Sequence, residues 1–140
     1  MTSTETNKAL VGRFFGEVVN KGNMELAEEV MAVDFVDHNA SPEATPGLEG
    51  FKQFISMVGT AFPDISVKVE DMVAEENKVT ARVTVSGTHK GTLMGSIPPT
   101  DKHATWTGID IFGIEDGKIT ERWSERNLFG LMQQLGVIPQ

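Results

Sequence analysis

Residues 106–127, WTGIDIFGIEDGKITERWSERN, are the stretch that decides the fold. Apolar and polar residues alternate on both sides of Glu115–Lys118, and a period of two with Asp-Gly between the halves predicts a β-hairpin. Two charged residues, Asp110 and Arg122, interrupt strands that otherwise have the composition of buried strands. The hairpin therefore carries both the strongest fold signal and the first candidate site.

The turn of this hairpin allows two registers. A two-residue turn at Asp116-Gly117 places Asp110 opposite Trp123, whereas a three-residue loop with a bulged Gly117 places Asp110 opposite Arg122. We prefer the second register because it pairs charge with charge, and each favourable cross-strand pair contributes about 0.2–1 kcal/mol. One face then suits a cavity lining, although an ion pair on a solvated face is the alternative. That face carries Trp106, Gly108, Asp110, Phe112, Arg122 and Ser124.

The rest of the chain extends this pattern. A period of 3.6 predicts helices, a period of two predicts strands, and Asn23 is a good cap for the second helix. Helices followed by a meander of antiparallel strands predict an α+β fold, with the helices on one face of a curved sheet. We expect one domain over residues 1–140, with helices at 5–20, 24–31, 51–62 and 128–136, an extended piece at 33–38, a loop at 41–50, strands at 65–69 and 79–85, and a long connection at 87–102.

The composition excludes several partners. Twelve Lys and Arg against twenty Asp and Glu give a net charge of −8, which disfavours nucleic acid and anionic membranes. No apolar stretch approaches the roughly 20 residues of a membrane span, and Met1–Leu10 lacks a secretory pattern, so we expect a cytoplasmic protein. Cysteine is absent, which removes disulfides and thiolate chemistry.

Known catalytic motifs are also missing. The sequence holds no Walker loop, dinucleotide fingerprint or HExxH motif, and His38, His89 and His103 lack metal-site spacing, so we expect neither a metal nor a cofactor. Carboxylates and His would then carry any chemistry. Asp37-His38 is the second candidate pair, because such groups exchange protons near neutral pH. A turn that follows the helix, satisfied by Asp and Asn side chains, is the alternative.

Five segments, taken in order, resemble the SnoaL-like polyketide cyclase family, also called ester cyclases. They are residues 7–39, residues 47–79, GTHKGTLMGSIPPTDK (87–102), TGIDIFGIEDGKI (107–119) and LFGLMQQLG (128–136), and the motifs GTHKG, IPPT and IDIFGIEDGKI make the resemblance specific. The resemblance covers nearly the whole chain. It implies the cone-shaped α+β barrel shared with nuclear transport factor two and ketosteroid isomerase, with three N-terminal helices on a strongly curved antiparallel sheet and a short C-terminal helix. It also implies a deep apolar pocket and a homodimer formed through the sheet.

The resemblance also implies a chemistry. The best-known members close a ring of an aromatic polyketide by an aldol condensation without a cofactor, and a pocket Asp removes the proton. That Asp matches Ser124 here, while two pocket His residues match Asp110 and Arg122. In the more distant ketosteroid isomerase comparison, the general-base Asp matches Asp37, the hydrogen-bond-donating Asp matches Asp110, and the pocket Tyr matches Phe15. Because Ser124 cannot act as a base at neutral pH, the cyclase mechanism does not transfer unchanged.

Our leading hypothesis is a pocket for a hydrophobic carbonyl compound that supports cofactor-independent acid–base chemistry. Asp37 or His38 would be the base or acid, and Asp110, ionised by Arg122, would orient the substrate with Arg122. The alternatives are a non-catalytic domain that binds a small ligand or dimerises, and a hydrolase or dehydratase. The expected pocket residues are Phe14, Phe15, Phe54, Trp106, Phe112, Ser124 and His89.

Overall fold

The computed structural model describes residues 3–139. Helix α1 (Ser3–Arg13) continues into the wider π-helical segment η1 (Phe14–Val19), and α2 (Met24–Val30), α3 (Gly47–Ala61) and α4 (Leu128–Leu135) are the other helices of this part of the chain. The strands are β1 (Met31–Asp37), β2 (Ser66–Glu75), β3 (Lys78–Thr88), β4 (His103–Glu115) and β5 (Lys118–Arg126).

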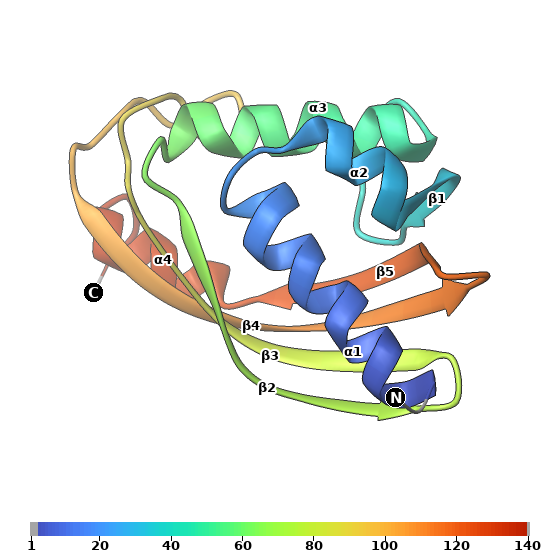
Figure 1. Cartoon of the computed structure of the whole chain (residues 1–140). Coiled ribbons are helices and arrows are strands. Elements are labelled where there is room, and N and C mark those ends of the chain that lie inside the picture. Colours follow the sequence, from blue (N-terminus) through green and yellow to red (C-terminus); the bar gives the residue numbers. More distant parts are fainter. Residues whose placement is uncertain (1–2, 140) are drawn as a thin grey trace.

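The described strands form one sheet in the order β1-β5-β4-β3-β2. Strands β2 to β5 are antiparallel neighbours, as predicted, but β1 pairs with β5 in parallel. The sheet is strongly curved and open, because β1 and β2 are its two edges and do not pair with each other (Figure 1). The α+β fold is therefore confirmed, with a mixed and half-open sheet in place of an entirely antiparallel one.

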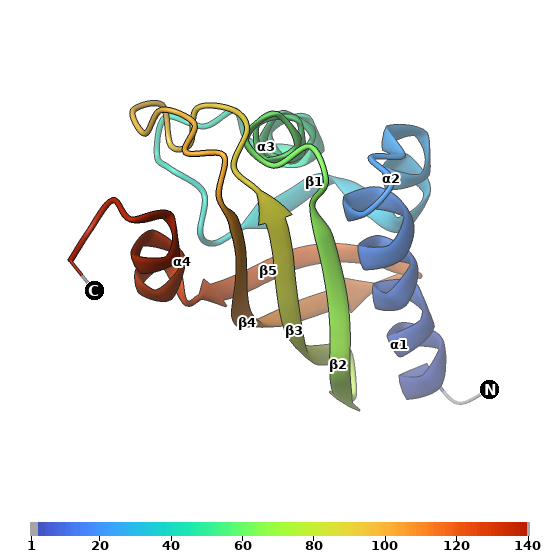
Figure 2. The same cartoon turned by 90° about the vertical axis from the view of Figure 1, so that its left-hand side faces the viewer.

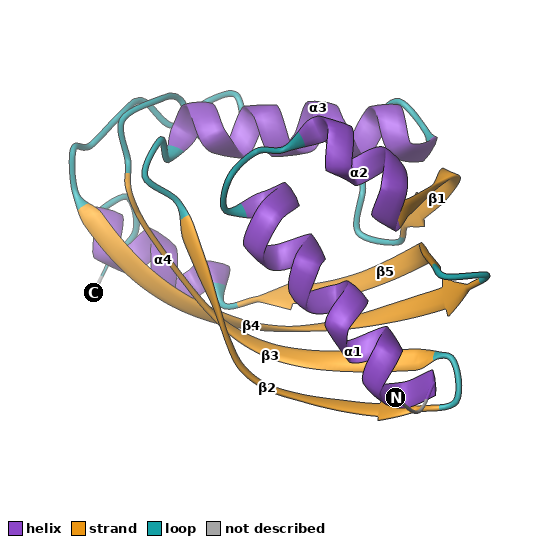
Figure 3. Ribbon diagram, in the orientation of Figure 1, coloured by secondary structure: helices purple, strands orange, loops and turns teal. Residues whose placement is uncertain are grey.

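Helices α1, α2 and α3 lie on the concave side of this sheet, and α4 lies beside the strands near the C-terminus (Figures 2 and 3). Helix α2 begins as predicted, because the Asn23 side chain accepts a hydrogen bond from the Leu26 amide at 3.1 Å. Helix α3 begins at Gly47, inside the segment 41–50 that we predicted as a loop. Pro46 occupies its N-cap, where the missing N–H costs no helical hydrogen bond, so a Pro-Gly pair marks the start of a helix here.

The β4–β5 hairpin corrects both predicted registers. Asp116 and Gly117 have φ values of 52° and 75°, which is the two-residue turn that we did not prefer. A register shift then leaves Thr120 as an extra residue on β5, so that Asp110 faces Ser124 and Phe112 faces Arg122. Because the extra residue restores the alternation, the predicted shared face of these side chains is correct even though the pairing is not.

The concave face forms the core. Alternate residues of β3 and β4 are buried, and an aromatic cluster from the helices packs on them. The rings of Phe14 and Phe15 lie 5.2 and 5.6 Å from that of Phe112, in edge-to-face contact. Burying side chains of this size contributes about 1.5–3 kcal/mol each to the free energy of folding. Among the described residues, the only charged side chains buried in this core are Asp110 and Arg122.

Candidate functional site

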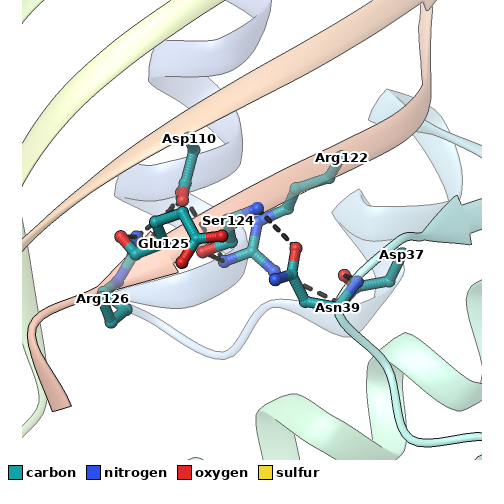
Figure 4. A network of polar contacts seen from close by, with 7 residues as sticks. All are labelled: Asp37, Asn39, Asp110, Arg122, Ser124, Glu125 and Arg126. Carbon is teal, nitrogen blue, oxygen red and sulfur yellow. Dashed lines mark hydrogen bonds and ion pairs between the residues drawn. The ribbon is translucent and has the colours of Figure 1, made fainter.

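Charged side chains from three neighbouring strands, β1, β5 and β4, meet on the concave face of the sheet. Arg122, Ser124 and Arg126 alternate along β5, Asp110 lies opposite Ser124 on β4, and Asp37 lies beside Arg122 on β1. We call Asp37, Arg122, Asp110 and Arg126 the charge network (Figure 4). Its signs alternate along the contacts, so its formal charge is zero.

Asp110 is held chiefly by Arg126. Both terminal nitrogens of Arg126 donate to the carboxylate, at 2.6 Å to Oδ1 and 3.0 Å to Oδ2, while Arg122 Nη2 lies 3.6 Å from Oδ2. Burial of this fully enclosed carboxyl raises its pKa, but the Arg126 hydrogen bonds and the charges of Arg122 and Arg126 outweigh burial and hold the pKa below its ordinary value. Asp110 is therefore a carboxylate at neutral pH and a poor proton donor.

Arg122 connects the two carboxylates. Its Nη1 donates to Asp37 Oδ2 at 3.3 Å, and its Nη2 donates to Ser124 Oγ at 3.2 Å. Burial lowers the pKa of Arg122, whereas the charges of Asp110 and Asp37 raise it. Its guanidinium carbon lies 5.7 Å from the centre of the Phe51 ring, a cation–π contact. The Nε–H is buried and has no hydrogen-bond partner among the described residues, which is a costly state for a charged donor.

Asn39 connects the loop after β1 to this network. Its side-chain oxygen accepts a hydrogen bond from the Ser124 amide at 2.6 Å, and its own amide donates to Asp37 Oδ1 at 3.0 Å. Figure 4 shows Asn39 lying between Asp37 and Ser124. Asp37 is thus fixed both by its neighbour in the loop and by the guanidinium across the ladder.

Sequence reasoning missed Arg126 and Asn39. The alternation that assigned Arg122 and Ser124 to one face also assigns Arg126 to it, but we ended the face at Ser124. Gly108 is the second overlooked signal, because it lies opposite Arg126 and a Cβ there would collide with the Arg126 side chain. No comparable pattern marks Asn39, since only the folded loop brings it to β5.

The structure places His38 outside the charge network. Its ring stacks on Trp123 at 4.4 Å with an interplanar angle of 6°, and its Nε2 lies 3.1 Å from Glu121 Oε1. Trp123 and Glu121 alternate with the inward-facing Arg122, so this contact is on the outer face of the sheet. Asp37 and His38 are neighbours in sequence but belong to opposite faces.

His89 is also separate from the charge network. It follows β3 at the end where Thr88 pairs with His103, whereas Asp110 pairs with Ala81, eight positions along the ladder from residue 89. At about 3.3 Å per residue this places the two side chains far apart along the sheet. The His89 ring is buried beside Phe62, and its Nδ1 accepts a hydrogen bond from the Thr100 amide at 3.2 Å.

The expected pocket walls pack against one another. Phe14, Phe15 and Phe112 are buried in mutual contact, Trp106 packs on Phe62 at 5.1 Å, and Phe54 is 44% exposed on α3. Two shallow hollows of about 410 and 440 Å³ open elsewhere, around β1 and the β4–β5 turn, and neither is lined by the charge network. Aromatic side chains thus occupy the space in which a ligand was expected.

Residues 3–139 contain no group of three or more His, Cys, Asp or Glu side chains that could hold a metal ion. None of the helices in this range is both long and apolar enough to cross a membrane.

Comparisons with known proteins give a consistent picture. The family model of the SnoaL-like polyketide cyclases matches residues 9–135. A nogalonic acid methyl ester cyclase from Streptomyces nogalater is 27% identical over 120 residues, covering 84% of this chain and 88% of that protein. The structure of TsrD from Streptomyces laurentii superposes with a TM-score of 0.89 at 30% identity, covering 99% of this chain and all of that one. A SnoaL-like polyketide cyclase from Agrobacterium tumefaciens shares the fold at 18% identity, with a TM-score of 0.79 over 93% of this chain and 98% of that one.

Proposed function

Because this chain belongs to the SnoaL-like polyketide cyclase family, we propose that it closes a ring in a hydrophobic carbonyl compound by an intramolecular aldol reaction that needs no cofactor. The observation that carries this proposal is the buried, unpartnered Nε–H of Arg122, a side chain whose Nη1 donates to the Asp37 carboxylate at 3.3 Å. A base and a charged donor in one enclosed place are what enolate formation requires.

Asp37 is the proposed base. Its carboxylate removes a proton from the carbon next to a substrate carbonyl, and Arg122 Nε–H donates a hydrogen bond to the oxygen that becomes the enolate. The enolate carbon attacks a second carbonyl carbon of the same molecule, which forms the new carbon–carbon bond. The resulting alkoxide takes the proton back from Asp37, so substrate and product are isomers and the carboxylate is regenerated.

The other charged groups support these two. Asp110 has too low a pKa to be an effective base and instead holds Arg122 from the side opposite Asp37. Ser124 accepts a hydrogen bond from Arg122. It stands where the resemblance places the family's Asp, directly across the ladder from Asp110, so a carboxylate is retained one strand away.

The substrate of this proposal enters at the Asp37 end of the charge network, beside the loop after β1. The side chains of Asp37 and Arg126 are 13% and 17% exposed, whereas Asp110 is fully buried. The network therefore reaches solvent at its two ends. A substrate that reaches Arg122 Nε displaces the Phe51 ring that lies over the guanidinium.

The test uses nogalonic acid methyl ester, the compound named for the Streptomyces nogalater relative. We expect the purified protein to convert it to an isomer of equal mass, resolved by chromatography, and Asp37→Asn to lower the rate by about 10²–10⁴-fold, the usual contribution of a general base. Asp34→Asn is the matched control, because Asp34 lies on the same strand but is exposed. Unchanged conversion by Asp37→Asn would remove Asp37 as the base.

A second candidate is a non-catalytic, ligand-binding member of the family. The observation that favours it is the packing of Phe14, Phe15 and Phe112, which fills the concave face. This candidate predicts that the methyl ester quenches tryptophan fluorescence saturably while the chain converts none of it. Conversion above the rate of the buffer alone decides against it.

We also propose that a second copy of the chain covers the outer face of the sheet. Ile109, Ile111 and Trp123 are 50%, 38% and 36% exposed there, and large apolar side chains on one bare sheet face are typical of an interface. Sedimentation should give a dimer for the wild type and a monomer for Ile111→Asp. A wild-type monomer at micromolar concentration would contradict this assembly.

A further inference from the structure

We infer that Arg126 is a positioning residue, which fixes Asp110 as the anchor of Arg122, and that Gly108 is the residue that leaves Arg126 room to do so. The inference rests on the proposed function, since it assigns how the donor of that site is held. Neither residue touches the proposed substrate position at Arg122 Nε. Both act through Asp110.

The contacts indicate that the position of Arg122 depends on Asp110, and that the position of Asp110 depends on Arg126. Arg126 donates to both carboxylate oxygens of Asp110, at 2.6 and 3.0 Å. Within residues 3–139, its guanidinium makes one other hydrogen bond, from Nη1 to the neighbouring Glu125 carbonyl oxygen at 3.3 Å. Arg122 is farther from Asp110, at 3.6 Å, and shares its Nη2 with Ser124. Asp110 is thus oriented by Arg126, and its remaining charge attracts Arg122.

Gly108 provides the space for this arrangement. It is the register partner of Arg126 on β4, and a Cβ at this position would meet the Arg126 guanidinium, its Cδ and the Glu125 carbonyl oxygen. Glycine weakens a strand, so its use in the middle of β4 needs a compensating reason. The close approach of the Arg126 side chain over the β4 backbone is that reason.

Loss of Arg126 would change the charge balance around Asp110. The charged groups facing Asp110 are Arg122 and Arg126 from β5 and, beyond Arg122, Asp37 from β1. Its partner on β3 is the uncharged Ala81, and the helices contribute the phenyl rings around Phe112. Without Arg126, two carboxylates share one guanidinium, and burial favours the protonated form of Asp110. Arg122 would then pair with Asp37 alone, and this closer ion pair would make the Asp37 carboxylate a weaker base.

The first test measures the titration of Asp110 itself. In protein with ¹³C-labelled Asp, we expect Arg126→Gln to raise the apparent pKa of the Asp110 carboxyl by at least about one unit relative to the wild type. Arg82→Gln is the matched control, because it removes an Arg–Asp pair at 2.8 Å that lies exposed on the outer face. Coinciding titrations of wild type and Arg126→Gln would overturn the inference.

The second test separates position from charge. Gly108→Ala keeps every charge but displaces the Arg126 side chain, so it should raise the Asp110 pKa in the same direction as Arg126→Gln. Gly113→Ala is its control, since a Cβ there meets Glu121 and not Arg126. Circular dichroism identifies variants that fold, and Arg126→Lys replaces Arg126→Gln if the latter does not. An unchanged Asp110 titration in a folded Gly108→Ala variant would refute the role of Gly108.

The separate values of kcat and KM distinguish a positioning role of Arg126 from a purely structural one. With the methyl ester, we expect Arg126→Gln to lower kcat about tenfold or more with KM within about threefold, and Arg126→Lys to recover part of the loss. Equal effects on kcat and KM would contradict positioning. If the wild type converts no substrate, the proposed function fails, while the titration still decides the role of Arg126.

Discussion

Asp37 and Arg122 are register partners in the parallel β1–β5 ladder, although 85 residues separate them in the chain. The Asp37 carboxylate thereby meets the guanidinium of Arg122 at 3.3 Å, and the Arg122 side chain is 8% exposed. The pairing requires the parallel β1, so the edge strand that departs from the expected antiparallel sheet is also the strand that completes the charge network.

We predict that Asp110→Asn lowers the free energy of unfolding by about 3–5 kcal/mol, the usual cost of removing one member of a buried ion pair. The substitution leaves Arg122 and Arg126 without their shared carboxylate. Urea unfolding followed by circular dichroism measures the difference. Asp71→Asn, which breaks the exposed pair with Arg82, should cost no more than about 1 kcal/mol. Equal costs for the two variants would show that burial of the network has no energetic role.

We predict that Asp110 contributes an acid-sensitive part of the stability. Its folded-state pKa is lowered, so the unfolded chain binds the proton more readily. The contribution is therefore complete above the unfolded pKa of about 3.9 and is lost as pH falls through the lower, folded pKa. Unfolding free energies between pH 2 and 6 should fall less steeply for Asp110→Asn than for the wild type. Parallel curves would contradict the lowered pKa.

Two glycines of α3 should respond with opposite signs to the same substitution. A Cβ at Gly59 meets nothing within 4 Å, so Gly59→Ala should stabilise by about 0.5–1 kcal/mol through helix propensity. A Cβ at Gly50 would collide with the Thr45 carbonyl, so Gly50→Ala should destabilise by about 1–3 kcal/mol. Melting temperatures measure both. Stabilisation by both substitutions would mean that the start of α3 packs differently.

We predict that Asn39→Ala loosens the loop after β1. It removes the acceptor for the Ser124 amide, which should cost about 0.5–1.5 kcal/mol and speed hydrogen exchange at that amide. Asn7→Ala is the control, since the Asn7 side chain donates to Glu76 O at the surface over a longer distance of 3.4 Å. A Ser124 amide that exchanges at the wild-type rate would show that another group holds the loop.

The fold could be predicted because its signals are local and periodic. The helical period of 5–20, the Asn23 cap and the alternation of 79–85 each depend on neighbours a few residues away, and each appears where expected. The hairpin register could not be predicted, because the turn residues do not reveal that Thr120 is an extra residue on β5. The direction of β1 depends on the whole sheet, and no local pattern specifies it.

The candidate site could be predicted only in part. Asp110, Arg122 and Asp37 are distinguished by charge within apolar surroundings, and the alternation places the first two on one face. Their partners Arg126 and Asn39 are ordinary polar residues in the sequence and acquire meaning only from the ladder and the loop. The separation of His38 from Asp37 follows from strand alternation, which we applied to the hairpin and not to residues 33–38.

The proposed mechanism requires Arg122 Nε–H to donate a hydrogen bond to the substrate carbonyl oxygen while Asp37 acts as the base. A crystal structure of the Asp37→Asn variant with nogalonic acid methyl ester tests this most directly, because the variant should bind the compound without converting it. We predict a carbonyl oxygen of the ligand within about 2.7–3.2 Å of Arg122 Nε. A ligand held instead in the hollow lined by Glu28, Asp34 and Lys118, with Arg122 Nε still unpartnered, would contradict the account.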